Sequence, residues 1–201
     1  MKNTLPFLAL CFMLLSSFIL RPLADGYKVG DKATDFKLKN IDGKMVSLAD
    51  NKAAKGYIVV FTCNTCPFAK DYESRIIDLN TKYAPLGYPV VAINPNDPAV
   101  TPGDSFADMQ KKKYAFPYLQ DETQQVAKTY GATRTPHLYI LTKRGADFVV
   151  SYIGAIDDNS EDAKLAKTKY VENALTEILA GKPATTNSTK AIGCTIKWKR
   201  A

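Results

Sequence analysis

The sequence predicts an α/β fold in which a central mixed sheet is flanked by helices. Two apolar, β-branched runs, 57–62 and 89–94, are typical of buried strands, and the segment between them, 68–83, has apolar residues at helical spacing. A strand, a helix and a second strand in this order imply parallel strands at the centre of the sheet. Two later runs, 137–141 and 148–153, are separated by a short turn and predict an antiparallel edge.

The remaining elements complete the layers around this sheet. Asp42-Gly43 lies between two short alternating runs and indicates an N-terminal hairpin. Helices are expected over 105–114 and 121–130, and a longer helix is expected over 163–180, which Gly181 would end. The chain has 201 residues, which is enough for one domain with a substantial core, and it contains no internal repeat.

The N-terminus has the layout of a secretory signal peptide. Lys2 precedes a largely apolar stretch over 5–20, and small and polar residues follow. This stretch is shorter than the roughly 20 residues that a membrane span needs. We therefore predict a signal peptide over 1–24, one folded domain over 25–182 and a C-terminal tail over 183–201. The protein is expected to be exported, periplasmic or extracellular, and an uncleaved anchor is the alternative.

The charge balance gives no sign of a nucleic-acid partner. Removing Lys2 and Arg21 with the signal peptide leaves 25 basic and 20 acidic side chains, a net charge of +5. The run Lys111-Lys112-Lys113 has no aromatic or glycine-rich context, so we interpret it as a solvated helix face. We expect no nucleic-acid binding, and membrane contact only through the signal segment if it is uncleaved.

The motif Cys63-Asn64-Thr65-Cys66 lies where the first buried strand passes into a helix. Free N–H groups and the positive dipole end of that helix favour a thiolate at Cys63, with Cys66 one turn deeper. An exported protein meets an environment in which disulfides persist. The motif therefore predicts a thiol–disulfide redox site. Cys63 would attack and Cys66 would resolve the mixed disulfide, while Asn64 and Thr65 would tune the thiolate by hydrogen bonding.

Five short motifs carry a resemblance to a known family. They are residues 61–70, Asp104-Ser105, and residues 116–123, 130–132 and 154–158. Together they span about residues 30–160 and resemble the peroxiredoxin-like redoxins of the AhpC/TSA type, within the thioredoxin-like superfamily. The resemblance implies a thioredoxin-like fold and thiol redox chemistry. It aligns Cys63 with the first thioredoxin cysteine, and Cys66 with the peroxidatic position of true peroxiredoxins. We expect thiols or disulfides of proteins or small molecules as partners, together with an unidentified electron donor, and no cofactor.

The pair Thr135-Pro136 stands immediately before the strand 137–141. In a thioredoxin-like fold this loop faces the cysteines, and we expect its proline to be cis. The backbone of Thr135 would then pair with an incoming extended peptide, so Thr135, Pro136 and Arg134 are the predicted substrate-binding residues. Arg134 would lower the pKa of Cys63 or steer an acidic substrate; the alternative is a plain surface charge.

A thiol peroxidase is the first alternative function. Cys66 or Cys63 would form a sulfenic acid, Cys194 would resolve it, and Arg134 would stabilise the peroxide anion. The pattern disfavours this function, because Cys63 stands where a peroxiredoxin has Thr or Ser three residues before its reactive cysteine. Apart from that role, Cys194 is expected to be a buried structural thiol, and a tail that reaches the active site is the alternative.

A copper-binding protein is the second alternative. Cys63, Cys66 and the lone His137 would be its ligands, although copper-binding relatives of this fold place three residues between their cysteines. A structural zinc site would need a fourth ligand, for which Cys194 is the obvious candidate. We interpret His137 as an ordinary strand residue and predict no metal site.

Overall fold

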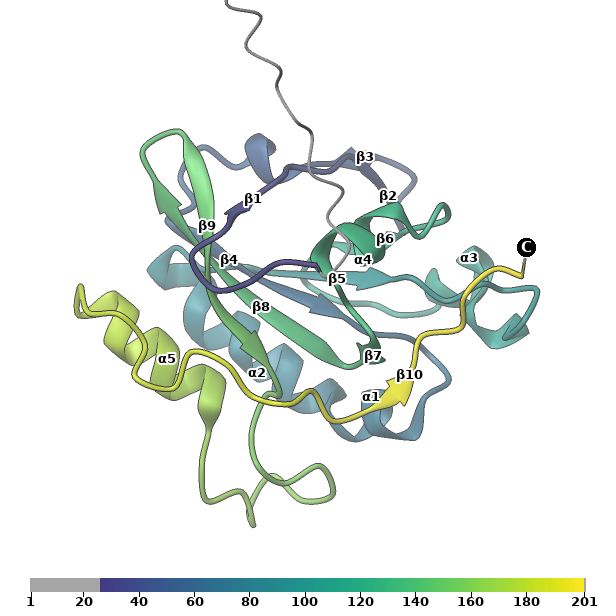
Figure 1. Ribbon diagram of the computed structural model, residues 1–201. Coiled ribbons are helices and arrows are strands. Elements are labelled where there is room, and N and C mark those ends of the chain that lie inside the picture. Colours follow the sequence, from purple (N-terminus) through teal and green to yellow (C-terminus); the bar gives the residue numbers. More distant parts are fainter. Residues whose placement is uncertain (1–25, 201) are drawn as a thin grey trace, which may run out of the picture.

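The computed structural model describes residues 26–200, so the predicted signal peptide lies outside the described residues (Figure 1). Its centre is an eight-stranded sheet in the order β1-β9-β8-β4-β5-β6-β2-β3. The strands are β1 (Lys32–Ala33), β2 (Leu38–Asn40), β3 (Met45–Val46), β4 (Gly56–Phe61), β5 (Val90–Asn94), β6 (Tyr118–Gln120), β8 (His137–Arg144) and β9 (Asp147–Gly154). β4, β5 and β6 run parallel, whereas the other pairings in this sheet are antiparallel. The predicted mixed sheet, with its N-terminal hairpin, is confirmed.

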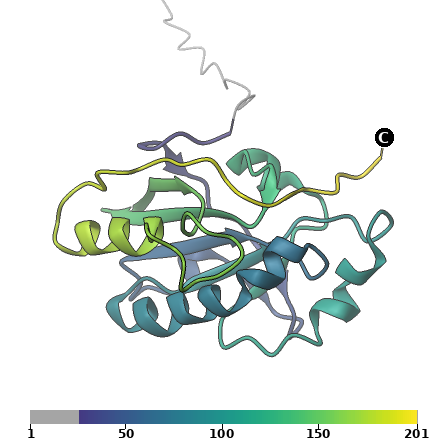
Figure 2. The same cartoon turned by 90° about the horizontal axis from the view of Figure 1, so that it is seen from below.

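Helices cover both faces of the sheet. They are α1 (Pro67–Asp71), α2 (Glu73–Tyr83), α3 (Phe106–Met109), α4 (Gln125–Tyr130) and α5 (Tyr170–Leu179), with single 3₁₀ turns at Leu48–Asp50, Ala84–Leu86 and Pro102–Asp104. Figure 2 shows α1, α2 and α5 on one side of the sheet, and α4 with the N-terminal segment on the other. No helix within residues 26–200 is long and apolar enough to cross a membrane.

β4 is buried on both of its faces, which explains its continuous apolar run. Ile58 and Val60 pack in the cluster that contains the buried faces of α2 and α5. Val59 and Phe61 point to the opposite face and pack in the cluster that contains Tyr130 of α4. Side chains alternate along a strand, so a strand between two helical layers needs apolar residues at every position.

The last long helix is shorter than the sequence predicts, because α5 begins at Tyr170 rather than at 163. The Asn159 side chain accepts backbone N–H groups of Glu161 (3.0 Å) and Asp162 (2.9 Å). Such local side-chain bonds offer the backbone an alternative to the helix. The segment also exposes Leu165, so it has no apolar face to bury.

The two short helices also differ from their predicted ranges. α4 begins at Gln125, because Gln124 has a φ of 61° and cannot continue a right-handed helix. α3 ends at Met109, so the lysine run lies in a turn beyond it instead of on a helix face. There Lys111 pairs with Asp108, while Lys112 reaches α2.

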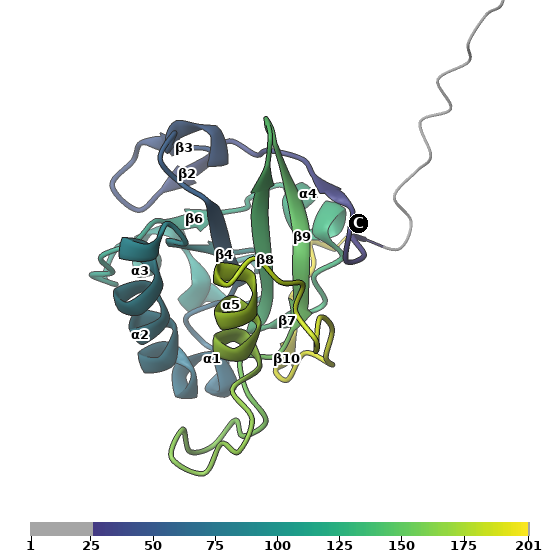
Figure 3. The ribbon, with the colours of Figure 1, turned by 90° about the vertical axis from the view of Figure 1, so that its left-hand side faces the viewer.

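The C-terminal tail packs along the folded domain. Near the end of β9, Ile153 donates its N–H to the Asn187 carbonyl (3.1 Å) and accepts from the Thr189 N–H (2.9 Å). The tail then forms β10 (Cys194–Thr195), which pairs antiparallel with β7 (Arg134–Thr135). Figure 3 shows β10 and β7 together close to α1. A segment far along the chain is thus brought to the end of the molecule that carries the cysteines.

Candidate active site

The two motif cysteines lie in the connection between β4 and α1. β4 ends at Phe61, and α1 begins at Pro67, so Cys66 is the N-cap residue of the helix. Proline favours the first helical position, because its missing N–H would have no partner there. The prediction that Cys66 lies one turn inside the helix is therefore wrong. Cys66 caps the helix, and Cys63 precedes it in the loop.

Both sulfurs converge on Thr135. Cys63 Sγ lies 3.2 Å from Thr135 Oγ1, and Cys66 Sγ lies 3.2 Å from the Thr135 carbonyl oxygen. The Thr135–Pro136 peptide is cis, as predicted. Cys63 and Cys66 are free thiols and both are buried, with exposed fractions of 6% and 5%. The structure thus brings Cys63, Cys66 and Thr135 together from segments about seventy residues apart.

The acidities of the two thiols diverge. A hydrogen bond from the Cys63 thiol lowers the pKa of Cys66 to about 5, against the effect of burial, and contacts from Cys194 and the Ala69 N–H act in the same direction. The same shared proton raises the pKa of Cys63, as do burial and the negative charge of Asp104. A thiolate is therefore favoured on Cys66 and disfavoured on Cys63. The prediction was the reverse, with the thiolate on Cys63 and Cys66 as the resolving thiol.

Asp104 holds the centre of the cysteine motif. It is 1% exposed, and one of its oxygens accepts the Asn64 N–H (2.6 Å) while the other accepts the Thr65 hydroxyl (2.7 Å). Side-chain amides of Asn94 (3.3 Å) and Asn96 (2.9 Å) donate to the same carboxylate. These bonds to charged oxygens fix the loop that presents both sulfurs.

Asn64 and Thr65 therefore act differently from the prediction that they tune the thiolate by hydrogen bonding. The Asn64 side chain donates to the Gly103 carbonyl (3.0 Å) and accepts from the Tyr118 hydroxyl (3.0 Å), so it anchors the loop. Sequence reasoning missed Asp104 as a site residue, because next to Ser105 it resembles a helix cap. In the structure Ser105 is the cap of α3 and accepts the Asp108 N–H.

Arg134 and Cys194 meet in the paired strands β7 and β10. Arg134 Nη1 donates to the Gly193 carbonyl at 2.8 Å, so its guanidinium holds the tail. Cys194 is partly buried and packs against the cluster of Cys63, Cys66 and Ala69. Of the two predicted positions of Cys194, the structure shows the tail that reaches the active site. Burial and the neighbouring Cys66 raise the pKa of Cys194 to about 11.

His137 starts β8 but is not bound to either sulfur. Its Nδ1 accepts the Thr133 N–H at 3.4 Å, and its ring lies 4.9 Å from that of Tyr139. Burial lowers the pKa of His137 to about 4, so the imidazole is neutral at pH 7. Among residues 26–200, no group of three or more His, Cys, Asp or Glu side chains is placed to hold a metal ion. In the described residues, Cys63, Cys66 and His137 therefore do not form the copper site of the second alternative.

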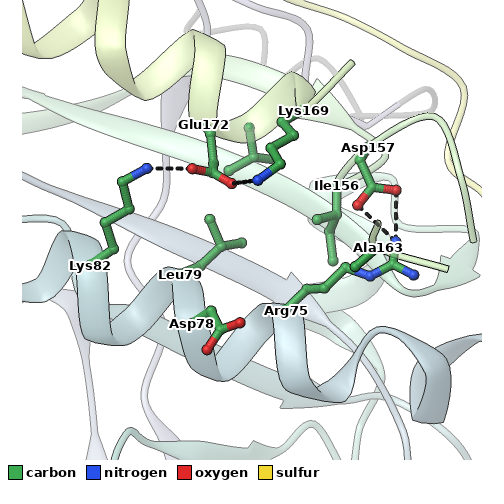
Figure 4. Close-up of a pocket in the computed structure, with 10 residues that line it drawn as sticks. Arg75, Asp78, Leu79, Lys82, Ile156, Asp157, Ala163, Lys169 and Glu172 are labelled. Atoms are coloured by element: carbon green, nitrogen blue, oxygen red, sulfur yellow. Dashed lines mark hydrogen bonds and ion pairs between the residues drawn. The ribbon is translucent and has the colours of Figure 1, made fainter. Parts of the chain in front are cut away.

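A separate cavity of about 110 Å³ lies between α2 and α5 (Figure 4). The Arg75 guanidinium contacts both oxygens of Asp157, at 2.8 and 2.7 Å, on one side of it. Lys82 bonds to Glu172 on the other side. The cavity contains neither cysteine of the motif nor Thr135, so we assign it to the joint between the two helices.

The fold and the convergent sulfurs define a thioredoxin-like thiol redox protein. The chain belongs to the AhpC/TSA family, whose model matches residues 29–158. Thiol-disulfide oxidoreductase ResA of Bacillus cereus is 24% identical over 151 residues, 72% of this chain and 85% of that protein. Putative peroxiredoxin Rv2521 of Mycobacterium tuberculosis is 30% identical over 145 residues, 70% of this chain and 83% of that protein. The solved structure of an uncharacterized conserved protein from Geobacillus kaustophilus is 38% identical, with a TM-score of 0.79 over 87% of this chain and 94% of the other.

These similarities confirm the redoxin resemblance and the thioredoxin-like fold that it implied. The protein is an oxidoreductase of this class.

Proposed function

We propose that the protein is an exported thiol–disulfide oxidoreductase whose redox couple is the Cys63–Cys66 dithiol and disulfide. The observation that carries this proposal is the convergence of both sulfurs on Thr135, at 3.2 Å each. Two adjacent thiols of opposite pKa shift give one nucleophile and one resolving group. The substrates are disulfides or thiols of proteins or small molecules, and an electron donor returns the protein to the dithiol form.

The opposite pKa shifts support the following roles for the two cysteines. The Cys66 thiolate attacks one sulfur of a substrate disulfide, so that a mixed disulfide forms and one substrate sulfur leaves as a thiolate. Cys63 gives its proton to that leaving thiolate and attacks Cys66 Sγ. The Cys63–Cys66 disulfide then closes, and the second substrate sulfur leaves and takes up a proton from water. The substrate disulfide is reduced to two thiols, and the protein dithiol is oxidised by the same two electrons.

Serine variants test both the function and the roles. In a Cys194→Ser background, which leaves only the motif cysteines in residues 25–201, Cys63→Ser should trap glutathione on Cys66 when glutathione disulfide is added. The matched Cys66→Ser variant should react about tenfold more slowly, because burial and the charge of Asp104 still raise the pKa of Cys63 after Cys66 is removed. Equal rates would contradict the roles, and absence of any exchange by the protein with both motif cysteines would contradict the function.

A thiol peroxidase is the second candidate, and one observation favours it. The low-pKa sulfur is Cys66, which matches the peroxidatic position of the family. Its thiolate would attack a peroxide oxygen and form a sulfenic acid, with release of water or an alcohol after protonation, and Cys63 would condense with it and release water. Rapid peroxide consumption by the reduced protein, measured by stopped flow and lost in Cys66→Ser, would support this candidate over disulfide exchange.

Export is the part of the proposal that depends on residues 1–24. Full-length protein expressed from its own start should appear in the exported fraction with Asp25 as its first residue, as N-terminal sequencing would show. An intact Met1 on protein in the membrane fraction would instead support the uncleaved anchor.

A further inference from the structure

The C-terminal tail occupies the backbone edge at which an extended peptide is expected to pair. β10 pairs antiparallel with β7, and Cys194 stands directly opposite Thr135. Thr135 is the residue that contacts both motif sulfurs. Adding a strand to an open edge is a common way for proteins to bind extended peptides. The tail therefore lies against its own active site as a bound peptide would.

Contacts on both sides of Cys194 fix its position. Before it, the Gly193 carbonyl accepts a hydrogen bond from Arg134 at 2.8 Å. After it, Ile196 donates its N–H to the Thr133 carbonyl (3.1 Å), and its side chain is only 3% exposed in the core. Burial of the Ile196 side chain stabilises this position of the tail.

The next residue, Lys197, is also fixed by its backbone. Its N–H donates to Asn96 Oδ1 (2.9 Å), and its carbonyl accepts from the Asp97 N–H (2.9 Å) and the Gln124 side chain (2.9 Å). Asn96 also donates to Asp104, which holds the cysteine motif. The tail and the motif loop therefore share one anchor.

Gly193 permits the close approach of the tail. A Cβ atom at this position would lie 2.3 Å from the Thr135 carbonyl oxygen and 2.9 Å from the Pro136 nitrogen. Both neighbours are backbone atoms of the active-site loop, which cannot rotate away from a side chain at this position. The residue before Cys194 is thus small where the tail passes closest to the loop.

These contacts place the Cys194 thiol against Cys66. Cys194 packs on the small cluster of Cys63, Cys66 and Ala69, and of the two motif cysteines Cys66 is the one that raises the pKa of its thiol. Cys63, by contrast, faces the Thr135 hydroxyl. Of the two motif sulfurs, Cys66 is therefore the expected exchange partner of Cys194.

We infer that Cys194 is a third redox-active thiol, which exchanges with the motif disulfide to form a Cys66–Cys194 disulfide. Cys194 loses its proton and attacks Cys66 Sγ in the Cys63–Cys66 disulfide. The bond between Cys63 and Cys66 breaks, the bond between Cys66 and Cys194 forms, and Cys63 leaves as a thiolate that takes up the proton. One disulfide is exchanged for another, so no further oxidant is needed.

This inference rests on the proposed function, because the Cys63–Cys66 disulfide is its starting material. The exchange moves the oxidising equivalent from the buried motif to the tail and releases Cys63 as a free thiol. It also ties β10 covalently over the Thr135 edge. A competing peptide would then meet a closed edge until the donor reduces the tail disulfide.

Residues 25–201 contain three cysteines, so single serine variants give a clean test. Cys63→Ser, oxidised with glutathione disulfide and blocked with N-ethylmaleimide, should form the Cys66–Cys194 disulfide. Trypsin would then release peptides 56–70 and 191–197 joined by one disulfide. Cys66→Ser is the matched control and should give little of this joined pair, because Cys194 packs on Cys66. In the oxidised wild type, N-ethylmaleimide should label both Cys63 and Cys194, one in each disulfide isomer.

The inference is overturned if Cys63→Ser ends only as separate glutathione adducts while the oxidised wild type is labelled at Cys194 alone. Equal yields of the joined peptides from Cys63→Ser and Cys66→Ser would also overturn it, since random collision of the tail would explain both. Cys194→Ser separates this failure from failure of the main proposal. If it still forms the Cys63–Cys66 disulfide, the oxidoreductase function stands without the third thiol.

Discussion

Asp157 and Asp104 are two buried carboxylates that the protein satisfies in different ways. They are 4% and 1% exposed. Asp157 meets a cation, since Arg75 Nη1 contacts both of its oxygens. Asp104 meets only neutral donors, among them the Asn64 N–H and the Thr65 hydroxyl. The negative charge of Asp157 is therefore neutralised by an adjacent cation, whereas that of Asp104 is not.

Asp104 is the one of these two carboxylates that affects the acidity of a motif thiol. The Arg75–Asp157 pair ties α2 to the segment after β9, and neither residue is among the groups that shift the pKa values of the motif thiols. The charge of Asp104 lies near Cys63 and helps to raise the pKa of that thiol. A thiolate is therefore disfavoured on Cys63 and favoured on Cys66, where the shared proton of Cys63 stabilises it.

Asp157→Asn should have the largest effect on stability. Arg75 would remain buried without its counter-ion, and breaking a buried pair in this way costs about 3–5 kcal/mol. The loss should appear in the free energy of unfolding from urea titrations, while the thiol acidities stay the same. Asp78→Asn is the matched control, because Asp78 lines the same cavity but is exposed, and it should change stability by less than about 0.5 kcal/mol. A similar loss in both variants would show that the buried ion pair contributes no more to the free energy of unfolding than an exposed carboxylate.

Asp104→Asn should destabilise the protein by about 1–3 kcal/mol, less than the first variant. No buried cation is left unpaired, but the asparagine amide group would face donors that need an acceptor. Urea unfolding checks this value. A loss larger than that of Asp157→Asn would contradict the contrast between the two carboxylates.

The stability of the reduced protein should rise with pH between about 5 and 8. The pKa of Cys66 is lowered to about 5 in the folded state, so the unfolded chain still holds a proton that the folded protein has released. The gain is at most about 1.4 kcal/mol per pH unit, and it is lost as the pH falls through the folded pKa. Urea unfolding under reducing conditions should show this slope in the wild type and a smaller slope in Cys66→Ser. Parallel slopes would mean that Cys66 is not the acidic thiol.

Asp104→Asn should also make Cys63 more reactive, the smallest of these effects. In a Cys66→Ser, Cys194→Ser background Cys63 is the remaining thiol of residues 25–201, and removing the neighbouring negative charge lowers its pKa. Iodoacetamide should then alkylate Cys63 several-fold faster at pH 8. An unchanged rate would assign Asp104 a purely structural role.

Local patterns were sufficient to predict the parts of the site that depend on neighbours in sequence. A buried strand, the two cysteines and an amphipathic helix follow one another in the chain, and the Thr135–Pro136 bond precedes a strand. The predicted helical segment, 68–83, begins within one residue of α1, but Cys66 was placed one turn inside the helix, whereas it caps the helix. That error has a local remedy, because Pro67 marks the first helical position.

The remaining parts depend on contacts between distant residues, which leave no periodic signal. Asp104 reaches Asn64 across a 40-residue separation, and Arg134 reaches Gly193 across 59 residues. Neither contact changes the local pattern of apolar residues from which helices and strands are predicted. From the local pattern alone Cys194 therefore resembles a structural thiol, because its position at the active site depends on the pairing of β10 with β7.

The exchange function is tested most directly by a redox titration of residues 25–201 in glutathione buffers, with mass-spectrometric mapping of tryptic peptides, on Cys194→Ser and on the wild type. The proposal predicts a reversible two-electron couple in Cys194→Ser, in which peptide 56–70 carries an internal Cys63–Cys66 disulfide when oxidised. If that internal disulfide does not form at any ratio of glutathione to its disulfide, the Cys63–Cys66 couple is not the redox centre of this protein.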